Sequence, residues 1–411
     1  MRILFIDKFF PPIGGPGSYT RCVGEALCRR GHDIMQFGCD TGRPPDAENA
    51  DELPEFRDFT QTGGSLLRGL PSLARMIHNT EAANKLERFC RRNPPDVAHL
   101  HNIYHHLTPS VLAPLARAKA GIVMRLADYR LACPVKHFLR PRGHCMLCHP
   151  NRFFHAASPD CAGLGGAGLA VETYFHRVAR SYFRWVDFFI CPTQFMRRTM
   201  LELGAPAGKL VVLRNAVPNL KPPHEASEGP PELLFAGRMS FEKAPERMLE
   251  LAQRIPDAAV TLAGDGPLLQ QLKHSAEQSG LGNVTFTGHV PHDGLGRLIA
   301  RASAVVITSR WLENSTMSML EAMRAGRCVI VPDRGPLVEW IRDGVTGRTY
   351  RADDVDSLER VAREVLSGAE DRRRMGTVAA ELVARRHEPG LIAERLEVLY
   401  EAARARCALR W

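Results

Sequence analysis

Residues 304–326 read AVVITSRWLENSTMSMLEAMRAG. The first five residues predict a buried strand, and apolar residues that recur at three-residue steps further on predict a helix with one buried stripe. Those apolar residues are Met317, Leu320 and Met323. We place the start of the helix at Asn314 or Ser315, because either side chain makes a good N-cap. A strand, a short polar loop and a helix put the loop at the carboxyl edge of a parallel sheet, where α/β proteins bind ligands.

Two glutamates, Glu313 and Glu321, stand eight positions apart in this stretch. Two helical turns rise about 11–12 Å, which is comparable to the distance from the ribose to the sugar of a nucleotide-sugar. Between the carboxylates, the free N–H groups at the start of the helix could bind a diphosphate. The alternative is a capped helix with one solvated and one structural glutamate, since surface carboxylates are common.

The segment resembles the retaining glycosyltransferases of family 4. Their signature of two glutamates separated by seven residues, followed by an Ala-Met/Leu-x-x-Gly turn, matches Glu313 to Gly326. The resemblance implies an α/β protein of the GT-B class, with two Rossmann-like domains facing a central cleft and a C-terminal helix crossing back to the first domain. It also implies that Glu313 holds the transferring sugar and Glu321 the ribose. The other donor-binding residues expected in this loop are Asn314, Ser315 and Thr316.

The length of 411 residues suits two α/β domains, each with its own core. Residues 216–231 are rich in proline and charge, which is typical of a linker between domains. We therefore expect an acceptor-binding domain over residues 1–215 and a nucleotide-sugar-binding domain over residues 232–385. Residues 386–411 are expected to form the helix that packs back on the first domain.

Two cations follow the strand predicted from residue 232, first Arg238 and then Lys243. Arginine can donate paired hydrogen bonds to phosphate oxygens and lysine adds a point charge, so together they could neutralise a departing diphosphate without a divalent metal. An Arg…Lys pair at this strand end has that role in the family, although its members usually have glycine where this chain has Ala244. Taken alone, either residue could be a surface cation.

Further parts of the family pattern follow in the second half. Residues 284–288 with Val290 match the segment that lies beneath the nucleobase in the family. Gly335 matches the first glycine of a family Gly-Gly pair, and Pro336 replaces the second. Asp354-Val-Asp356 offers the Asp-x-Asp of metal-dependent transferases, but it precedes a helical pattern, where acidic residues favour the N-terminus. We interpret it as a helix cap, and no cofactor is expected to be required for catalysis.

In the first half, a strand over residues 3–6 leads into a proline-rich loop with Gly14 and Gly15. A helix is predicted from Ser18 to Arg30. Glycines at a strand-to-helix turn let the backbone approach a ligand closely, although tight turns also use glycine. The resemblance implies that Gly14 and Gly15 lie near the donor phosphates or the acceptor.

The end of the strand predicted from residue 122 departs from the family pattern. Family members usually have His-Asp there, with the histidine beside the reacting sugar, whereas this chain has Ala127 and Asp128. Either Asp128, as a catalytic group, and a cleft histidine such as His101 cover the missing role, or the acceptor chemistry is weakened or lost. His101 could equally be a core residue with satisfied contacts.

Four cysteines between residues 133 and 161 could hold a structural zinc ion in a tetrahedral site. They are Cys133, Cys145, Cys148 and Cys161. Similar cysteines occur in some polysaccharide-building relatives on the corresponding loop, but plain reduced cysteines are the alternative. The chain has eleven cysteines, an odd number, and its first residues read as a strand rather than a signal peptide, which suggests a reducing cytoplasm.

The positive charge is concentrated in the first half. Residues 1–215 hold 28 Lys/Arg against 18 Asp/Glu, a net charge of +10, and residues 216–411 hold 26 against 27. Nucleic acid is not expected as a partner, because no recognised motif accompanies the charge. An anionic membrane attracts basic residues by about 1 kcal/mol each, and basic amphipathic helices predicted over residues 66–90 could lie on a bilayer or pack in the core. A solvated basic face is the other reading.

These expectations together indicate a retaining, metal-independent hexosyltransferase. It would move a sugar from a UDP- or GDP-sugar to a glycan or polyprenyl-linked acceptor in surface polysaccharide or lipopolysaccharide synthesis, in the cytoplasm or at the inner face of the membrane. Two other classes stay open. One is a non-catalytic GT-B protein that binds a sugar nucleotide or a partner, which Ala127 motivates; the other is a sugar-nucleotide epimerase or hydrolase.

Overall fold

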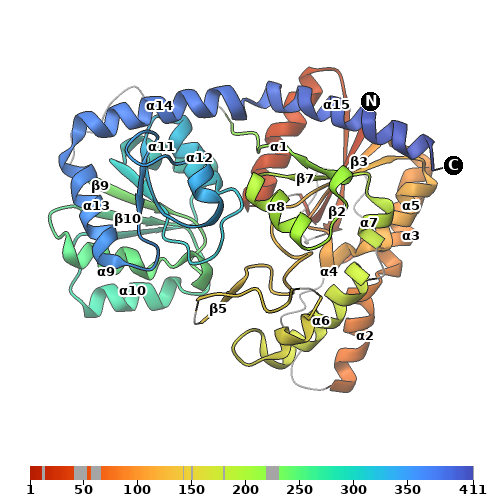
Figure 1. Ribbon diagram of the computed structural model, residues 1–411, viewed down its shortest axis with the longest axis horizontal. Coiled ribbons are helices and arrows are strands. Elements are labelled where there is room, and N and C mark those ends of the chain that lie inside the picture. Colours follow the sequence, from red (N-terminus) through yellow and green to blue (C-terminus); the bar gives the residue numbers. More distant parts are fainter. Residues whose placement is uncertain are drawn as a thin grey trace. The chain divides into compact units, whose positions relative to one another are not determined.

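A parallel six-stranded sheet covered by helices forms the centre of each of two units in the computed structural model (Figure 1). The first unit comprises Met1–Ala216 and Pro389–Trp411, and the second comprises Val217–Glu388. The structure describes residues 1–11, 14–40, 53–56, 66–141, 143–149, 151–178, 181–218 and 231–410. Most of the predicted linker, residues 216–231, therefore lies outside the described residues.

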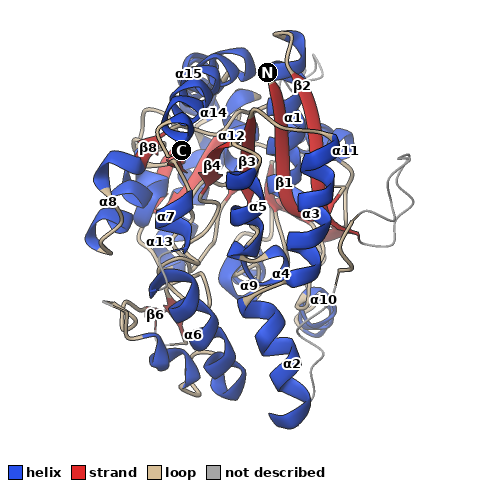
Figure 2. Ribbon diagram, turned by 90° about the vertical axis from the view of Figure 1, so that its right-hand side faces the viewer, coloured by secondary structure: helices blue, strands red, loops and turns tan. Residues whose placement is uncertain are grey.

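The sheet of the first unit has the order β2-β1-β3-β4-β7-β8. Its strands are β1 (Arg2–Phe10), β2 (Asp33–Asp40), β3 (Val97–His101), β4 (Gly121–Arg125), β7 (Phe188–Cys191) and β8 (Leu210–Val212). Figure 2 labels β8, β4, β3, β1 and β2 of this sheet. The strands β3 and β4 are buried along their whole length and no residue of β1 is exposed, as expected of parallel strands covered on both faces. The strand order reverses between β1 and β3, which is the topological switch point of this sheet.

Helices cover the first sheet, and a short hairpin, β5 (Leu139–Arg140) and β6 (Gly143–His144), follows β4. The helices are α1 (Gly14–Arg29), α2 (Leu66–Ile77), α3 (Thr80–Arg92), α4 (Tyr104–Leu107), α5 (Leu112–Arg117), α6 (Gly163–Val178), α7 (Ser181–Trp185), α8 (Gln194–Glu202) and α15 (Pro389–Ala408). Short 3₁₀ helices span Pro109–Val111, Phe153–Ala157 and Ala207–Lys209. The helices α1 and α15 pack against one face, where Tyr19, Val23, Ile392 and Tyr400 share a core with the strands.

Two helix starts in the first unit differ from the sequence predictions, and one predicted helix is assigned to the core. The helix predicted from Ser18 begins at Gly14, so the paired glycines form its first turn. The last helix begins at Pro389 rather than 386, because Glu388 is extended and ends the preceding helix. In α3 the apolar stripe, including the fully buried Leu86, belongs to the core instead of a membrane surface. Side chains 66–70 of α2 lie outside the described residues.

The sheet of the second unit has the order β11-β10-β9-β12-β13-β14. Its strands are β9 (Glu232–Ala236), β10 (Ala259–Ala263), β11 (Val284–Gly288), β12 (Ala304–Val306), β13 (Cys328–Pro332) and β14 (Arg348–Tyr350). Its helices are α9 (Glu246–Arg254), α10 (Leu269–Gln278), α11 (His292–Arg301), α12 (Met317–Arg324), α13 (Val355–Ser367) and α14 (Ala369–His387), with 3₁₀ helices at Phe241–Lys243 and Gly335–Glu339. One face of the sheet is covered by α9, α10 and α13, and the other by α11, α12 and α14.

None of the helices that the structure describes carries a long enough apolar run to span a membrane.

Candidate functional site

The carboxyl ends of β9 and β12 lie next to each other in the second sheet, where the strand order reverses. Arg238 and Lys243 follow β9, and Glu313 follows β12. Open parallel sheets bind their ligands at such a switch point. The strand order therefore brings the predicted cations and the predicted sugar-binding carboxylate to one edge of the sheet.

An ion pair between Lys243 and Glu313 forms the centre of this edge. The Lys243 Nζ lies 2.5 Å from the Glu313 Oε1, and the Ser309 hydroxyl donates to the same oxygen at 2.5 Å. Glu313 is 3% exposed. Burial raises the pKa of its carboxyl, but the Lys243 ammonium and the hydrogen bonds outweigh burial and hold the pKa below its ordinary value. Glu313 is therefore ionised at neutral pH.

The loop that carries Glu313 is fastened to the 3₁₀ helix that carries Lys243. The Thr308 hydroxyl donates to the Lys243 carbonyl at 2.8 Å, and the Arg310 N–H donates to the Glu242 carbonyl at 2.9 Å. This loop continues past the predicted helix start at Asn314 or Ser315, which was wrong, and α12 begins at Met317 after Thr316. The estimate of two helical turns between Glu313 and Glu321 no longer applies, because Glu313 lies outside the helix.

Three buried hydroxyl oxygens at this edge have no hydrogen-bond partner among the residues that the structure describes. They belong to Ser240, Ser315 and Thr316. A buried hydroxyl without a partner costs about 1–3 kcal/mol, so a ligand that accepts from all three would be favoured. The first N–H groups of α12 are also free of intrahelical partners. The sequence interpretation included Ser315 and Thr316. It missed Ser240, which lies between the two predicted cations, Arg238 and Lys243.

The backbone around Arg238 is held by close contacts between strand ends. The Gly237 N–H donates to the Ala263 carbonyl at 2.9 Å. A Cβ atom at Gly264 would lie 1.9 Å from the Gly237 carbonyl oxygen, so only glycine fits there. The Arg238 side chain is exposed. A rigid strand end with an exposed guanidinium is suited to binding an anion.

Glu321 and Val290 lie in different settings in the second unit. Glu321, in the second turn of α12, is 3% exposed, and burial raises its pKa to about 7. Val290 is half-buried and packs against the core on the α11 side of the sheet. Asp354 caps α13 by accepting from the Ser357 N–H at 2.9 Å, which confirms the cap interpretation of that segment.

The sequence-predicted residues of the first unit lie at or after the ends of the neighbouring strands β1, β3 and β4. His101 is fully buried, with its ring against Phe5, His99 and Tyr19. Asp128 is half-buried beside Ala127, and one of its oxygens accepts from the Arg130 N–H at 3.0 Å.

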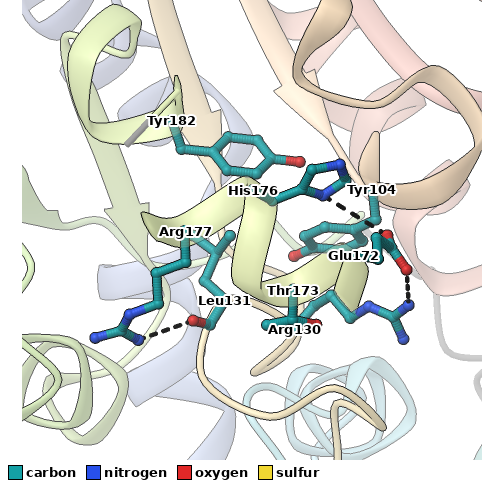
Figure 3. A pocket seen from close by; sticks show the side chains of 8 residues that line it. All are labelled: Tyr104, Arg130, Leu131, Glu172, Thr173, His176, Arg177 and Tyr182. Carbon is teal, nitrogen blue, oxygen red and sulfur yellow. Dashed lines mark hydrogen bonds and ion pairs between the residues drawn. The ribbon is translucent and has the colours of Figure 1, made fainter. Parts of the chain in front are cut away.

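A buried ionic cluster lies beside a small cavity in the first unit (Figure 3). The Arg130 guanidinium lies 2.8 Å from one Glu172 oxygen, and His176 lies 3.7 Å from the other. Burial raises the pKa of Glu172 in spite of the Arg130 charge. The space open to the centre of a water molecule is about 10 Å³, close to what one water needs. This cavity is too small for a sugar, and the sequence interpretation missed the cluster.

The four cysteines predicted to hold zinc are near one another, but they are not arranged as a metal site. Cys133 and Cys148 are buried, Cys145 and Cys161 are half-buried, and all four are free thiols. Burial first, and then the other three thiols, raise the pKa of Cys148 to about 12. Within the described ranges no group of three or more His, Cys, Asp or Glu side chains could hold a metal. Structural zinc stays a prediction, which a metal assay of the purified protein tests.

Two family models match consecutive parts of the chain. Residues 14–216 match a glycosyl transferase 4-like domain, and residues 217–382 match glycosyl transferases group 1. Glycogen synthase of Mycobacterium tuberculosis strain H37Rv is 25% identical over 429 residues, which cover 98% of this chain and 95% of the relative. The GDP-mannose-dependent alpha-(1-6)-phosphatidylinositol monomannoside mannosyltransferase of Mycolicibacterium smegmatis is 32% identical over 145 residues, 34% of this chain and 36% of the relative.

Solved structures resemble the whole chain. Anabaena HepE in complex with UDP and glucose superimposes with a TM-score of 0.67 at 17% identity, covering 98% of this chain and 100% of that one. Sucrose-phosphate synthase from Thermosynechococcus elongatus gives a TM-score of 0.73 at 16% identity, covering 99% of this chain and 100% of that one. These similarities concern the fold, and the shared arrangement is two Rossmann-like α/β domains.

Proposed function

Since the chain belongs to the family 4 glycosyltransferases, which are enzymes of the hexosyltransferase type with the GT-B fold, we propose that it moves a hexose from a nucleoside-diphosphate sugar to a carbohydrate or polyprenyl-linked acceptor in surface polysaccharide synthesis. The acceptor would be met at the inner face of the cell membrane. The observation that carries the proposal is the contact between Lys243 and the buried, ionised Glu313 at the switch point of the second sheet.

The donor would lie across the carboxyl ends of β9 and β12. Arg238 and Lys243 would bind the diphosphate, together with the unpartnered hydroxyls and the first N–H groups of α12. Glu313 would accept hydrogen bonds from the transferring sugar, and Glu321 from the ribose. Binding of the diphosphate would draw the Lys243 ammonium partly from Glu313 toward the phosphate oxygens, leaving carboxylate lone pairs for sugar hydroxyls.

The reaction would proceed with retention of configuration and without a metal ion. The bond between the anomeric carbon and the diphosphate oxygen breaks, and the acceptor hydroxyl oxygen bonds to that carbon from the same face. The acceptor proton passes to the leaving diphosphate oxygen, which makes the absence of a histidine at Ala127 tolerable. Arg238 and Lys243 stabilise the negative charge that develops on the leaving group, and such electrostatic stabilisation is commonly the largest contribution to catalysis.

Similar proteins with known nucleotide ligands or donors support a UDP or GDP donor. HepE was solved with UDP and UDP-glucose, and the mycobacterial mannosyltransferase depends on GDP-mannose. The base and the sugar that this chain prefers are tested by a donor panel of UDP-glucose, UDP-galactose, UDP-N-acetylglucosamine and GDP-mannose with bacterial lipid extract. Transfer of labelled sugar to lipid supports the proposal, whereas failure of every donor to transfer contradicts it.

A second candidate function follows from Ala127 and Asp128. The usual histidine is absent, and one Asp128 oxygen is already engaged by the Arg130 N–H, so the protein could bind a sugar nucleotide without transferring its sugar, or could epimerise or hydrolyse it. The same panel separates these functions. Binding without turnover indicates a binding protein, and an epimerised or hydrolysed donor indicates the corresponding enzyme.

The phosphate assignment has its own test, with UDP as the probe. Arg238→Ala should weaken UDP binding about tenfold or more, because a charged hydrogen bond contributes about 1.5–3 kcal/mol, and calorimetry measures the loss. Arg385→Ala is the matched control, since Arg385 is an exposed cation of the same unit, paired at 3.7 Å with Glu381. Unchanged UDP affinity in Arg238→Ala refutes the assignment. Activity lost with EDTA and restored by magnesium refutes the metal-independent reaction.

A further inference from the structure

The helix α6 (Gly163–Val178) has its charged side chains inside the protein and its largest described apolar side chains outside, although Ala170 is buried. Glu172, His176 and Arg177 are 1%, 6% and 8% exposed, whereas Tyr174 and Phe175 are 49% and 47% exposed. A helix on the surface of a protein in water normally does the reverse, because burial of the apolar stripe is what stabilises it. The inverted arrangement needs a partner that favours apolar side chains.

Buried polar contacts fix α6 in this orientation (Figure 3). Glu172 pairs with Arg130 at 2.8 Å, His176 lies 3.1 Å from the Ile77 carbonyl oxygen, and Arg177 donates to the Leu131 carbonyl at 3.0 Å. Rotation of α6 to bury its apolar side would expose or break all three contacts, and a buried charge that loses its partner costs about 3–5 kcal/mol. The outward apolar face is therefore built into the first unit.

The apolar face extends beyond α6. Eleven large hydrophobic side chains are exposed among the described residues, and six of them fall within residues 146–175. These six, which we call the apolar patch, are Met146, Leu147, Phe154, Val171, Tyr174 and Phe175. The chain neighbours of three of them, Cys148, Phe153 and Ala170, pack in one small core cluster, so the patch residues come from one region of the surface. Clusters of this kind mark interaction sites.

The charge around the apolar patch indicates what covers it. Residues 129–159 contain five Lys/Arg, and the first acidic residue after them is Asp160. Arg130 is buried against Glu172, Lys136 and Arg140 are half-buried, and Arg152 is exposed. We propose that the apolar patch docks the protein on an anionic lipid bilayer, with Phe154, Tyr174 and Phe175 at the boundary of headgroups and acyl chains and Arg152 among the headgroups. Aromatic residues favour that depth, and basic residues favour anionic lipid.

This inference deepens the proposed function, because a polyprenyl-linked acceptor would be met at such a surface. The two can fail separately, since vesicle binding is measured without donor or acceptor. A surface of the same residues that bound a second copy of the chain would instead produce a dimer in solution, and chromatography with light scattering detects it.

The test is sedimentation of the full-length protein with vesicles of phosphatidylcholine alone or mixed with phosphatidylglycerol. We expect binding to the mixed vesicles, and about a tenfold or greater loss in Phe154→Ser/Phe175→Ser, because each change removes an inserted apolar side chain. Val398→Ser/Leu409→Ser is the matched control, since both side chains are more exposed than the patch residues, at 70% and 88%, but lie outside residues 146–175. It should bind as the unchanged protein does.

A charge variant keeps the test decisive if the patch variant folds poorly. Arg152→Glu leaves the apolar patch intact and should lower binding to phosphatidylglycerol vesicles roughly fivefold or more, since one basic residue near such a surface contributes about that factor. Equal binding of the patch variant and the unchanged protein overturns the proposal. Equal binding to neutral and anionic vesicles also overturns it. A third contrary result is that the unchanged protein is a dimer that binds no vesicles and that the patch variant is a monomer.

Discussion

The carboxyl edges of the two sheets hold their polar groups in opposite ways. At the edge of the second sheet, the ionised Glu313 pairs with the partly exposed Lys243, beside buried hydroxyls that lack partners in the described part of the chain. Along the strands of the first sheet, burial lowers the pKa of His99 to about 3 and that of His101 well below its ordinary value, so both rings are neutral. The second edge is arranged to receive a charged ligand, whereas the first uses these groups internally.

The internal use of polar groups in the first unit joins distant segments. His99 Nδ1 lies 2.6 Å from the hydroxyl of Tyr400 in α15, and the Arg125 guanidinium donates twice to the Asn215 side-chain oxygen, at 3.0 and 2.8 Å. Each contact ties one element of the sheet to a segment 90 or more positions away. These groups are therefore parts of the scaffold, and the comparison predicts that charge removal affects turnover at the second edge and folding at the first.

Removal of the Glu313 charge should have the largest effect on turnover. Glu313→Gln should lower kcat on the order of 100-fold or more, because loss of one preorganised polar partner at a reacting centre has that size. The measurement is steady-state transfer with the donor that the panel identifies. Glu381→Gln, at an exposed carboxylate of the same unit, serves as control and should keep full activity. Wild-type turnover in Glu313→Gln would remove the distinction between the two edges.

Removal of the Glu172 charge should act on stability. Glu172→Gln leaves Arg130, which is 8% exposed, without its carboxylate, and breaking a buried pair in this way costs about 3–5 kcal/mol. The free energy of unfolding in urea measures the loss. Glu381→Gln is again the control, because an exposed pair contributes about 0–1 kcal/mol. If the two variants unfold alike, the cluster in the first unit does not support the fold as described.

The sequence predicted much of the second edge, because its residues fall in two short segments that match the family pattern. Arg238 and Lys243 follow one strand, and the segment from Glu313 to Gly326 is a continuous signature. Only the boundary of α12 was wrong, since the loop before it is held by hydrogen bonds to residues about 70 positions away, such as Glu242. Helix propensity in the loop itself gives no sign of those bonds.

The sequence predicted little of the first edge, because no motif marks the pairing of its polar groups. The Arg130–Glu172 pair joins the end of β4 to a helix 42 positions later, and a single sequence gives no measure of that proximity. Apolar periodicity in a helix normally indicates the buried side. In α6 the buried side is charged, so the pattern could not reveal which face points outward.

Stability of the second unit should depend on pH through Glu321. Burial raises its pKa to about 7 from an ordinary 4.5, so between those pH values the unfolded chain is ionised while the folded chain keeps its proton. Folding stability therefore falls as pH rises from about 4.5 to 7 and stays low above it, by on the order of 3 kcal/mol. Glu321→Gln has no proton to lose and should remove this fall. Melting curves at pH 5 and pH 8 measure it, and identical pH dependence in both proteins contradicts the assignment.

The smallest effect is expected at Ala244, which follows Lys243. Ala244 has φ 49° and ψ 50°, a left-handed conformation that costs a residue with a Cβ about 1–2 kcal/mol. Ala244→Gly should therefore raise the free energy of unfolding by about 1 kcal/mol and preserve the Lys243–Glu313 contact and turnover. The same substitution at Ala380, inside α14, should do the reverse and cost about 1 kcal/mol. Opposite signs in urea unfolding would show that the second edge tolerates alanine only under strain, whereas a loss at both positions would mean that the turn before α9 is not left-handed in solution.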